Sequence, residues 1–334
     1  MGRNKRSNRK SEFASQNAEL YAVLDRTLNE VIYPQEAINE GWEVIMRNQF
    51  HDILPGSSIK EVYDDSKVEY DNLEQATSKL IHASLKSLTA NINAPKNSVV
   101  VYNPNGFVNS ELVEFTIPEG MKDAVVYDGA EKLDCQKVSD TVVAFEAKDV
   151  PAKGYKTFAL KEEKSEPKAA LTVTDRLLEN SFFRITLNEK GQFTSLFDKT
   201  ANREVLKKGQ CGNVLMSYED KPHNHDAWDV NHYYKEKSWE IDDVTSMEIV
   251  EAGALKATLR VDDRYLNSSI SQYMTIYRDT PRLDIRHEID WKQKQIFVRQ
   301  LFPVDIHANE ATYEIQYGNV KRPTHMNTSW DFAK

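Results

Sequence analysis

The chain has 334 residues, which is too long for one compact core and predicts two or three domains. With 40% hydrophobic and 28% charged residues it has the composition of a soluble globular protein, and no apolar run reaches the roughly 20 residues of a membrane span. Its formal net charge of −9 argues against a nucleic-acid-binding protein, whose phosphate contacts need a basic face. We therefore expect neither nucleic acid nor a membrane as a partner.

Two further features bear on the compartment. Cys135 and Cys211 provide neither a disulfide framework nor zinc-ligand spacing. We therefore expect two reduced thiols in a cytoplasmic protein, with a single bridge between them as the alternative. The first ten residues, MGRNKRSNRK, are basic but lack the apolar core of a secretory signal. Short runs of this kind occur in nucleic-acid-binding arms and targeting segments, but the interpretation favoured here is a solvated flank.

Residues 11–95 carry the pattern of helices. Apolar side chains recur mostly at steps of three and four residues, beginning with Phe13, Leu20 and Leu24. Ser58 and Glu61 form an S-x-x-E pattern, which predicts a capping box at the start of the third helix. Three amphipathic helices with short connections predict an antiparallel bundle.

From residue 96 onward the apolar period changes to two, which indicates strands. We predict a small β-sandwich over residues 96–161, a charged linker over 162–170 and a larger β-sandwich over 171–334, with a hairpin turn at 189–191. The chain stops at TSWDFAK without a polar tail, so we expect this second sandwich to be truncated. The predicted fold class is α+β and multidomain, with a three-helix bundle followed by antiparallel β-sandwich domains.

The connection RNQFHDILPGSSIKEVYDDS, residues 47–66, places His51 beside Asp52 at a corner between two helices. In the structural interpretation, Asp52 caps the following turn and the His51 ring packs beside Phe50. Against it, Asp52 lies six residues before Ser58, too early to cap the third helix. Histidine next to a carboxylate is also a natural pair of metal ligands, since imidazole is a favoured ligand of zinc.

A second cluster of polar and aromatic residues, KPHNHDAWDVNHYY, occupies residues 221–234. Its H-x-H pattern could chelate a metal, but no third ligand follows at a diagnostic spacing. The aromatic residues offer flat faces for a sugar ring, and the carboxylates offer acceptors for its hydroxyls; they are Trp228, Tyr233, Tyr234, Asp226 and Asp229. The alternative is a long loop between domains that buries its aromatic residues.

The motif NQFHDILPGSSIKEVYDD resembles the corresponding motif of glycoside hydrolase family 38, the α-mannosidases, particularly their bacterial members. The segment NKRSNRKSEFASQNAE is similar to the passage from their catalytic barrel to their helical domain, so residues 1–10 are expected to be a remnant of that connection. DKPHNHDAWDVNHYY and YGNVKRPTHMNTSWDFAK resemble segments of their β-domains. The resemblance thus spans essentially the whole chain.

The resemblance implies an enzyme with a (β/α)₇ barrel, a three-helix bundle and β-sandwich domains that hydrolyses terminal α-D-mannosyl residues with retention. His51 then corresponds to the histidine that completes a zinc site whose other ligands come from the barrel. Asp52 corresponds to the residue that contacts mannose hydroxyls. The catalytic nucleophile and general acid are barrel residues, so none is expected in this chain. In the chain alone, the His51 ring is expected to face solvent or to be held by a local hydrogen bond.

The chemistry of glycoside hydrolysis leads to the same expectation. Retention requires two carboxylates about 5 Å apart, which one histidine and one aspartate at a corner cannot supply. The implied ligand is a mannose-containing oligosaccharide or glycoside, and assembly as a homo-oligomer stays open. Two other interpretations stay open as well: a non-catalytic carbohydrate-binding module that uses residues 221–234, and a structural domain that holds subunits together.

Overall fold

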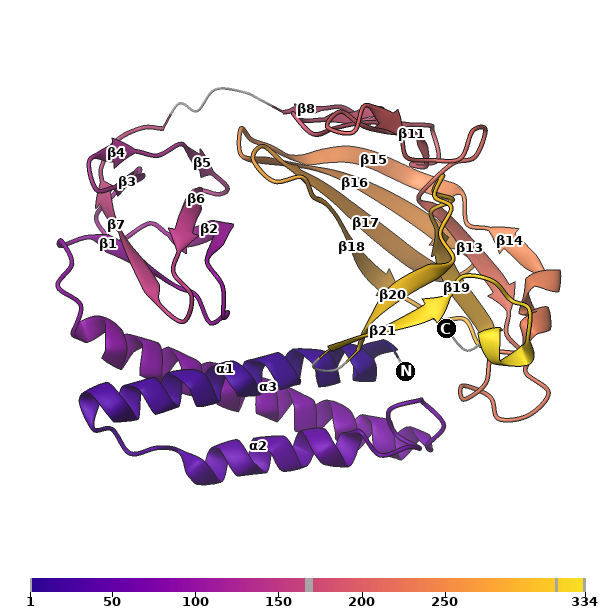
Figure 1. Cartoon of the computed structure of the whole chain (residues 1–334), viewed down its shortest axis with the longest axis horizontal. Coiled ribbons are helices and arrows are strands. Elements are labelled where there is room, and N and C mark those ends of the chain that lie inside the picture. Colours follow the sequence, from indigo (N-terminus) through magenta and orange to yellow (C-terminus); the bar gives the residue numbers. More distant parts are fainter. Residues whose placement is uncertain (1, 166–170, 316–317, 333–334) are drawn as a thin grey trace. The chain divides into compact units, whose positions relative to one another are not determined.

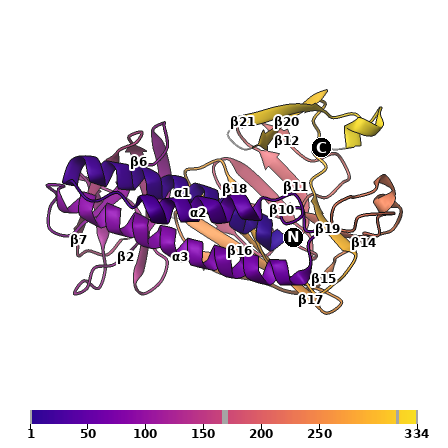
Figure 2. The same ribbon diagram turned by 90° about the horizontal axis from the view of Figure 1, so that it is seen from below.

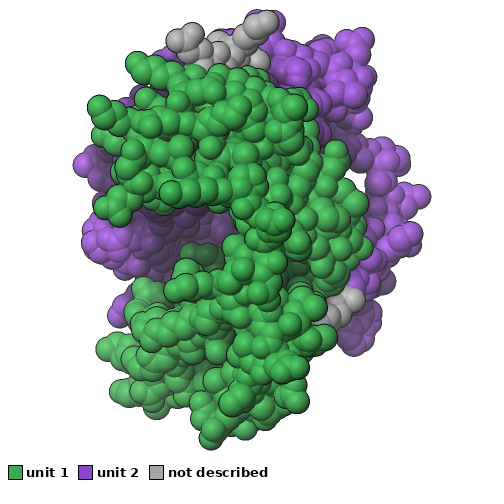
Figure 3. Space-filling model, turned by 90° about the vertical axis from the view of Figure 1, so that its left-hand side faces the viewer, with its two compact units in different colours: residues 1–166, 222–230 green, residues 167–221, 231–334 purple. Residues whose placement is uncertain are grey.

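The computed structural model confirms the α+β fold class, with helices followed by antiparallel strands (Figure 1). It describes residues 2–165, 171–315 and 318–332. The chain divides into two compact units, distinguished by colour in Figure 3. Unit 1 comprises residues 1–166 and 222–230, and unit 2 comprises residues 167–221 and 231–334. Residues 166–170 of the predicted linker lie outside the described residues. The domain boundaries expected from the sequence stay predictions.

Unit 1 begins with three helices that run alongside one another (Figure 2): α1 (Gly2–Asn29), α2 (Gln35–Asn48) and α3 (Lys60–Ala90). Ile45 of α2 and Tyr70 and Leu73 of α3 form a core that these two helices share. A Cβ atom at Gly41 would lie 2.9 Å from Cδ1 of Leu73. Glycine at this position therefore allows α2 to approach α3 closely.

The first helix starts earlier than the apolar pattern indicated, at Gly2 instead of residue 11. Its first turns bury polar side chains, which an apolar period cannot reveal. Tyr70 of α3 donates a hydrogen bond to Oδ1 of Asn8 at 3.0 Å, and Asn8 donates to Glu12 at 2.8 Å. The side chain of Asn4 accepts a hydrogen bond from Ser66 of α3. The basic side chains of this segment are mostly solvated, as predicted, but they project from a helix.

The second part of unit 1 is a small β-sandwich. One sheet has the order β1-β7-β3-β4, and the other has the order β2-β6-β5. The bounds are β1 (Ser98–Tyr102), β2 (Asn109–Thr116), β3 (Val125–Asp128), β4 (Glu131–Lys132), β5 (Cys135–Lys137), β6 (Val142–Val150) and β7 (Tyr155–Lys161). Both sheets contribute to one core, in which the rings of Phe145 and Phe158 meet edge to face at 5.0 Å. Cys135 is buried in this core, and both cysteines are free thiols.

Unit 2 is built on two further sheets that share a core. A five-stranded sheet has the order β12-β11-β10-β9-β8, and a four-stranded sheet has the order β15-β16-β17-β18. The bounds are β8 (Thr172–Val173), β9 (Leu177–Glu179), β10 (Phe183–Leu187), β11 (Phe193–Asp198), β12 (Arg203–Glu204), β15 (Asp243–Ala252), β16 (Lys256–Tyr265), β17 (Ser268–Tyr277) and β18 (Leu283–Asp290). The predicted hairpin is confirmed, because β10 pairs with β11 and Gly191 in the turn has φ +69°.

A three-stranded sheet and a hairpin complete unit 2. The sheet has the order β14-β13-β19, with β13 (Val214–Glu219), β14 (Ser238–Glu240) and β19 (Ile296–Leu301). The remaining elements are the hairpin β20 (Glu310–Ile315) and β21 (Gly318–Pro323) and the short helices η1 (His232–Glu236) and η2 (Ser329–Phe332). Across the described ranges, no helix combines the length and apolar character needed to cross a membrane.

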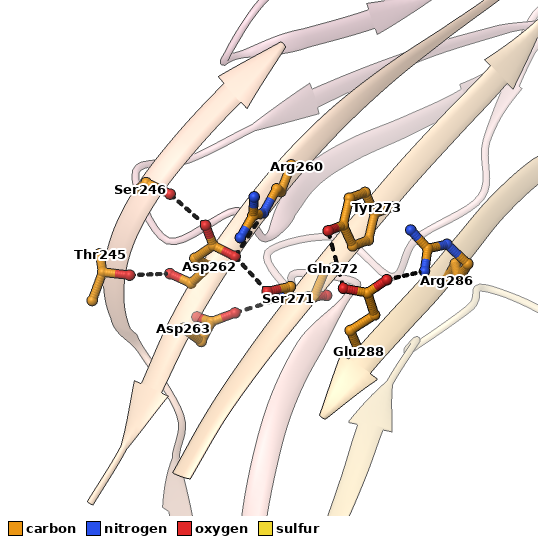
Figure 4. Close-up of polar contacts among 10 residues, drawn as sticks. All are labelled: Thr245, Ser246, Arg260, Asp262, Asp263, Ser271, Gln272, Tyr273, Arg286 and Glu288. Atoms are coloured by element: carbon orange, nitrogen blue, oxygen red, sulfur yellow. Dashed lines mark hydrogen bonds and ion pairs between the residues drawn. The ribbon is translucent and has the colours of Figure 1, made fainter. Parts of the chain in front are cut away.

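The four-stranded sheet has an apolar face and a polar face. Leu259, Val261 and Met274 point into the core of unit 2. On the opposite face, Asp262 accepts hydrogen bonds from Ser246 at 2.6 Å and from Arg260 at 2.9 Å (Figure 4). This alternation along β16 and β17 is what a strand period of two predicts for a sheet covered on one side.

Candidate functional site

The corner between α2 and α3 is a compact turn held by its own backbone. The carbonyl oxygen of Phe50 accepts hydrogen bonds from the amides of Ile53 at 2.9 Å and Leu54 at 3.1 Å. Pro55 and Gly56 follow, and Gly56 adopts φ +108°, a conformation that side-chain-bearing residues rarely reach. The Pro-Gly pair thus reverses the chain immediately after His51 and Asp52.

Two side chains, one just before α3 and one in its first turn, stabilise this corner by hydrogen bonds. Ser58 donates a hydrogen bond from Oγ to the carbonyl oxygen of Asp52 at 2.7 Å. The hydroxyl of Tyr63 lies 3.1 Å from the carbonyl oxygen of Ile53 and accepts a hydrogen bond from the amide of Ser58 at 3.1 Å. An apolar period cannot reveal this role of Tyr63, because it rests on the hydroxyl and not on the ring. An S-x-x-E pattern followed by a tyrosine was the only available signal.

The predicted capping box is wrong. The helix α3 begins at Lys60, its N-cap is Ile59, and no side chain caps it. The physical reason is that the Ser58 hydroxyl is already engaged by the carbonyl oxygen of Asp52. Ser58 therefore closes the turn before the helix.

The side chains of His51 and Asp52 face solvent, with exposed fractions of 65% and 53%. Nε2 of His51 lies 3.4 Å from Oδ2 of Asp52. The imidazole also contacts the ring of Phe50, with centroids 4.3 Å apart. The prediction of a solvent-facing His51 ring is thus confirmed, and so is the contact with Phe50 that the structural interpretation expected.

Residues 222–230 belong to unit 1, although the chain on both sides of them belongs to unit 2. A tight turn shapes this segment, because the amides of Trp228 and Asp229 both donate to the carbonyl oxygen of His225, at 3.0 and 3.1 Å. Two residues of the turn, His225 and Ala227, have positive φ angles of 59° and 65°. The turn brings Trp228 to His51, with ring centroids 6.2 Å apart and planes at 81°.

The other residues of the 221–234 cluster are distributed differently. Asp226 and Asp229 are exposed on the same turn as Trp228. Tyr234 is not an open platform for a sugar, because it packs edge to face against Tyr218 at 5.2 Å and Phe297 at 5.6 Å in unit 2. The expectation of a flat accessible face is therefore wrong for Tyr234, whose ring completes an aromatic cluster of the three-stranded sheet.

The corner has the chemistry of a partial metal site. An exposed imidazole is a suitable zinc ligand, and its carboxylate neighbour is either a ligand or a hydrogen-bond acceptor. Within the described part of the chain, no group of three or more His, Cys, Asp and Glu side chains is arranged to hold a metal ion. His51 and Asp52 therefore fit the role of one contributor to a site, and the H-x-H pattern of residues 223–225 does not form one.

Comparison with known proteins connects this architecture to one family. The model of the "Glycosyl hydrolases family 38 C-terminal domain" matches residues 178–334, and that of the "Alpha mannosidase middle domain" matches residues 1–88. The chain is 29% identical to alpha-mannosidase G of Dictyostelium discoideum, over 88% of the chain and 30% of that protein. It is 27% identical to human alpha-mannosidase 2C1, over 99% of the chain and 31% of that protein.

The fold is also that of a solved structure. An alpha-mannosidase from Enterococcus faecalis V583 superposes with a TM-score of 0.77 at 16% identity, over 96% of this chain and 45% of that one. These matches place the chain among the glycoside hydrolases. It belongs to glycosyl hydrolase family 38, as its motifs indicated. The chain spans about a third of the length of the curated relatives.

Proposed function

We propose that the chain is part of an α-mannosidase that removes terminal α-D-mannosyl residues with retention, and that the corner at His51 and Asp52 is one wall of its active site. The observation that carries the proposal is the pairing of these two exposed side chains on a fastened turn, with Trp228 beside them. The relatives are named alpha-mannosidases, which supports a mannose-containing oligosaccharide or glycoside as the ligand.

The residues have separate roles in this proposal. His51 contributes one ligand to a zinc ion, and Asp52 accepts hydrogen bonds from mannose hydroxyls. Trp228 offers an aromatic face to the sugar, and Asp226 and Asp229 accept hydrogen bonds from further hydroxyls. When bound, a zinc ion acts as a Lewis acid and orients the sugar by its hydroxyls. Adjacent side chains at a bend can point to different parts of one cleft, so His51 and Asp52 can serve the ion and the sugar separately.

The chain by itself is not expected to hydrolyse α-mannosides. Retention requires a nucleophilic carboxylate and an acid–base carboxylate about 5 Å apart, and the resemblance assigns both to a barrel domain. The relatives are about three times as long as the matched region, which leaves room for such a domain in a longer protein. The two free thiols support a cytoplasmic location for the protein that contains this chain.

Metal content and turnover of an aryl α-mannoside test the proposal in a longer protein that contains both this chain and a barrel. His51→Ala should lose metal and activity together, whereas Asp52→Ala should keep the metal and lose activity or sugar affinity. His82→Ala is the matched control, because His82 is an exposed histidine on α3. Full metal content and full rate in His51→Ala would show that the corner is structural.

A second candidate function is a non-catalytic carbohydrate-binding module. The exposed indole of Trp228 favours it, because aromatic faces support sugar rings. Isothermal titration of the chain with mannosides separates the candidates. Binding that survives His51→Ala and disappears in Trp228→Ala would favour the module, and no binding of any sugar would favour a structural domain.

A further inference from the structure

The contact between Trp228 and His51 joins two segments that are distant in sequence. Trp228 lies in the segment 222–230, which belongs to unit 1, and the plane of its ring makes an angle of 81° with that of the imidazole. Phe50 contacts the same imidazole at a centroid distance of 4.3 Å. His51 therefore has two aromatic neighbours, although its side chain is 65% exposed. An exposed histidine without such neighbours would exchange freely among rotamers.

The backbone around Trp228 is shaped for this contact. Positive φ is tolerated by histidine better than by most residues, but it is unfavourable for alanine because of the clash of Cβ with the backbone. Ala227 nevertheless adopts φ +65° immediately before Trp228. Conformations of this kind persist where the surrounding structure fixes them, and they are concentrated at functional sites. An unfavourable backbone conformation thus lies immediately before the residue whose ring contacts His51.

We propose that Trp228 is a positioning residue for His51, which it holds in the orientation needed for metal binding. This inference rests on the proposed function, in which His51 is a metal ligand. A ligand that is already ordered loses less conformational entropy when the metal binds, so the contact should raise metal affinity. Groups that orient a metal ligand by a hydrogen bond typically change affinity 10- to 100-fold. For the ring contact of Trp228 we expect an effect at the lower end of this range.

The contact itself can be measured in the chain as it stands. Imidazole proton resonances of His51, recorded by NMR on the histidine-labelled protein at one fixed pH, report ring currents from neighbouring aromatic side chains. Trp228→Leu should move these resonances toward random-coil values, and Trp228→Phe should restore part of the displacement. Trp239→Phe is the matched control, since Trp239 is 48% exposed and Trp228 is 45% exposed. Unchanged His51 resonances in Trp228→Leu would overturn the proposal.

Two variants of Ala227 test the turn without removing the indole. Glycine accepts positive φ, so Ala227→Gly should keep the displacement of the His51 resonances. Proline requires φ near −65°, so Ala227→Pro should lose it. Equal resonances in the two variants would contradict a role for this turn. Because residue 227 lies in a surface turn, both variants should keep the amide spectrum of the helical bundle.

Metal affinity then separates this inference from the proposed function. In a longer protein that contains the barrel, Zn²⁺ affinity measured by chelator competition should fall about tenfold in Trp228→Leu and recover partly in Trp228→Phe. A lost ring-current effect with unchanged affinity would show that Trp228 touches His51 without positioning it. If His51→Ala itself leaves affinity unchanged, the proposed function fails, whatever the NMR spectra of the Trp228 variants show.

Discussion

Gln272 donates a hydrogen bond from Nε2 to Oδ2 of Asp263 at 2.9 Å on the buried face of the four-stranded sheet, where each residue is only 2% exposed. Burial raises the pKa of Asp263 to about 6; the bond from Gln272 opposes this, and the neighbouring carboxylates Asp262, Asp242 and Asp243 reinforce it. The folded protein thus binds this proton more tightly than the unfolded chain does. The stability gained in this way is complete below about pH 4 and is lost as the pH rises through about 6.

Asp263→Asn should therefore stabilise unit 2 at neutral and higher pH. The substitution keeps an acceptor for Gln272 and removes the buried charge, so the free energy of unfolding should rise by roughly 1–3 kcal/mol at pH 8 and change little at pH 4. Urea unfolding at both pH values measures this difference. A variant that is less stable than the wild type at pH 8 would contradict the role assigned to burial.

Asp262→Asn is the matched control and should act in the opposite direction. Burial raises the pKa of Asp262, but hydrogen bonds from Ser246, Ser271 and Arg260 outweigh it and lower the pKa (Figure 4). The ionised carboxylate therefore stabilises the fold above the unfolded pKa near 4, and this contribution is lost as the pH falls through the folded value. The variant should be less stable than the wild type at pH 7, and the difference should shrink in acid.

His287 should make unit 2 sensitive to acid. Burial lowers its pKa, and in the described structure its Nε2 atom has no hydrogen-bond partner. Stability is therefore complete above the ordinary value near 6.5 and is lost as the pH falls through the lower folded value. An NMR titration should place the midpoint of His287 below about 6.5. His287→Phe should retain stability at pH 8 and lose less of it than the wild type at pH 5.

Tyr70→Phe should destabilise the bundle by about 1–2 kcal/mol, because it leaves the buried Oδ1 of Asn8 without the hydroxyl that donates to it. The loss should also increase hydrogen exchange in the first turns of α1. Tyr63→Phe provides a comparison, because the hydroxyl of Tyr63 donates a hydrogen bond to the carbonyl oxygen of Ile53 and not to a residue of α1. Unchanged exchange over residues 2–10 in Tyr70→Phe would show that α1 does not need this bond.

Substitutions at Ser58 and Glu61 distinguish two models: a corner closed by the Ser58 hydrogen bond and a helix α3 capped by a side chain. Ser58→Ala removes the hydrogen bond to the carbonyl oxygen of Asp52 and should lower stability by about 1 kcal/mol. Glu61→Gln should have almost no effect, because no side chain caps α3. Chemical unfolding of the two variants measures this difference. Equal losses of stability in both variants would support the capping box that the sequence predicted.

The sequence by itself determined the succession of helices and strands and the pair at the corner. The change of apolar period near residue 96 marks the end of the bundle, because side-chain direction repeats at 3.6 residues in helices and 2 in strands. His51 and Asp52 could be recognised without a structure because they are adjacent along the chain. The motif around them was also sufficient to identify the family.

Only the tertiary structure decided which polar residues are buried and which distant residues meet. In the run RVDDRY, strand alternation requires Asp262 and Asp263 to face opposite ways, but the packing of the sheet selects Asp263 as the buried one. Asn8 is buried because Tyr70 of another helix satisfies it. Trp228 reaches His51 because a turn with positive φ at Ala227 folds residues 222–230 against the corner. Local sequence carries period and adjacency, whereas burial and long-range contacts depend on which elements pack together.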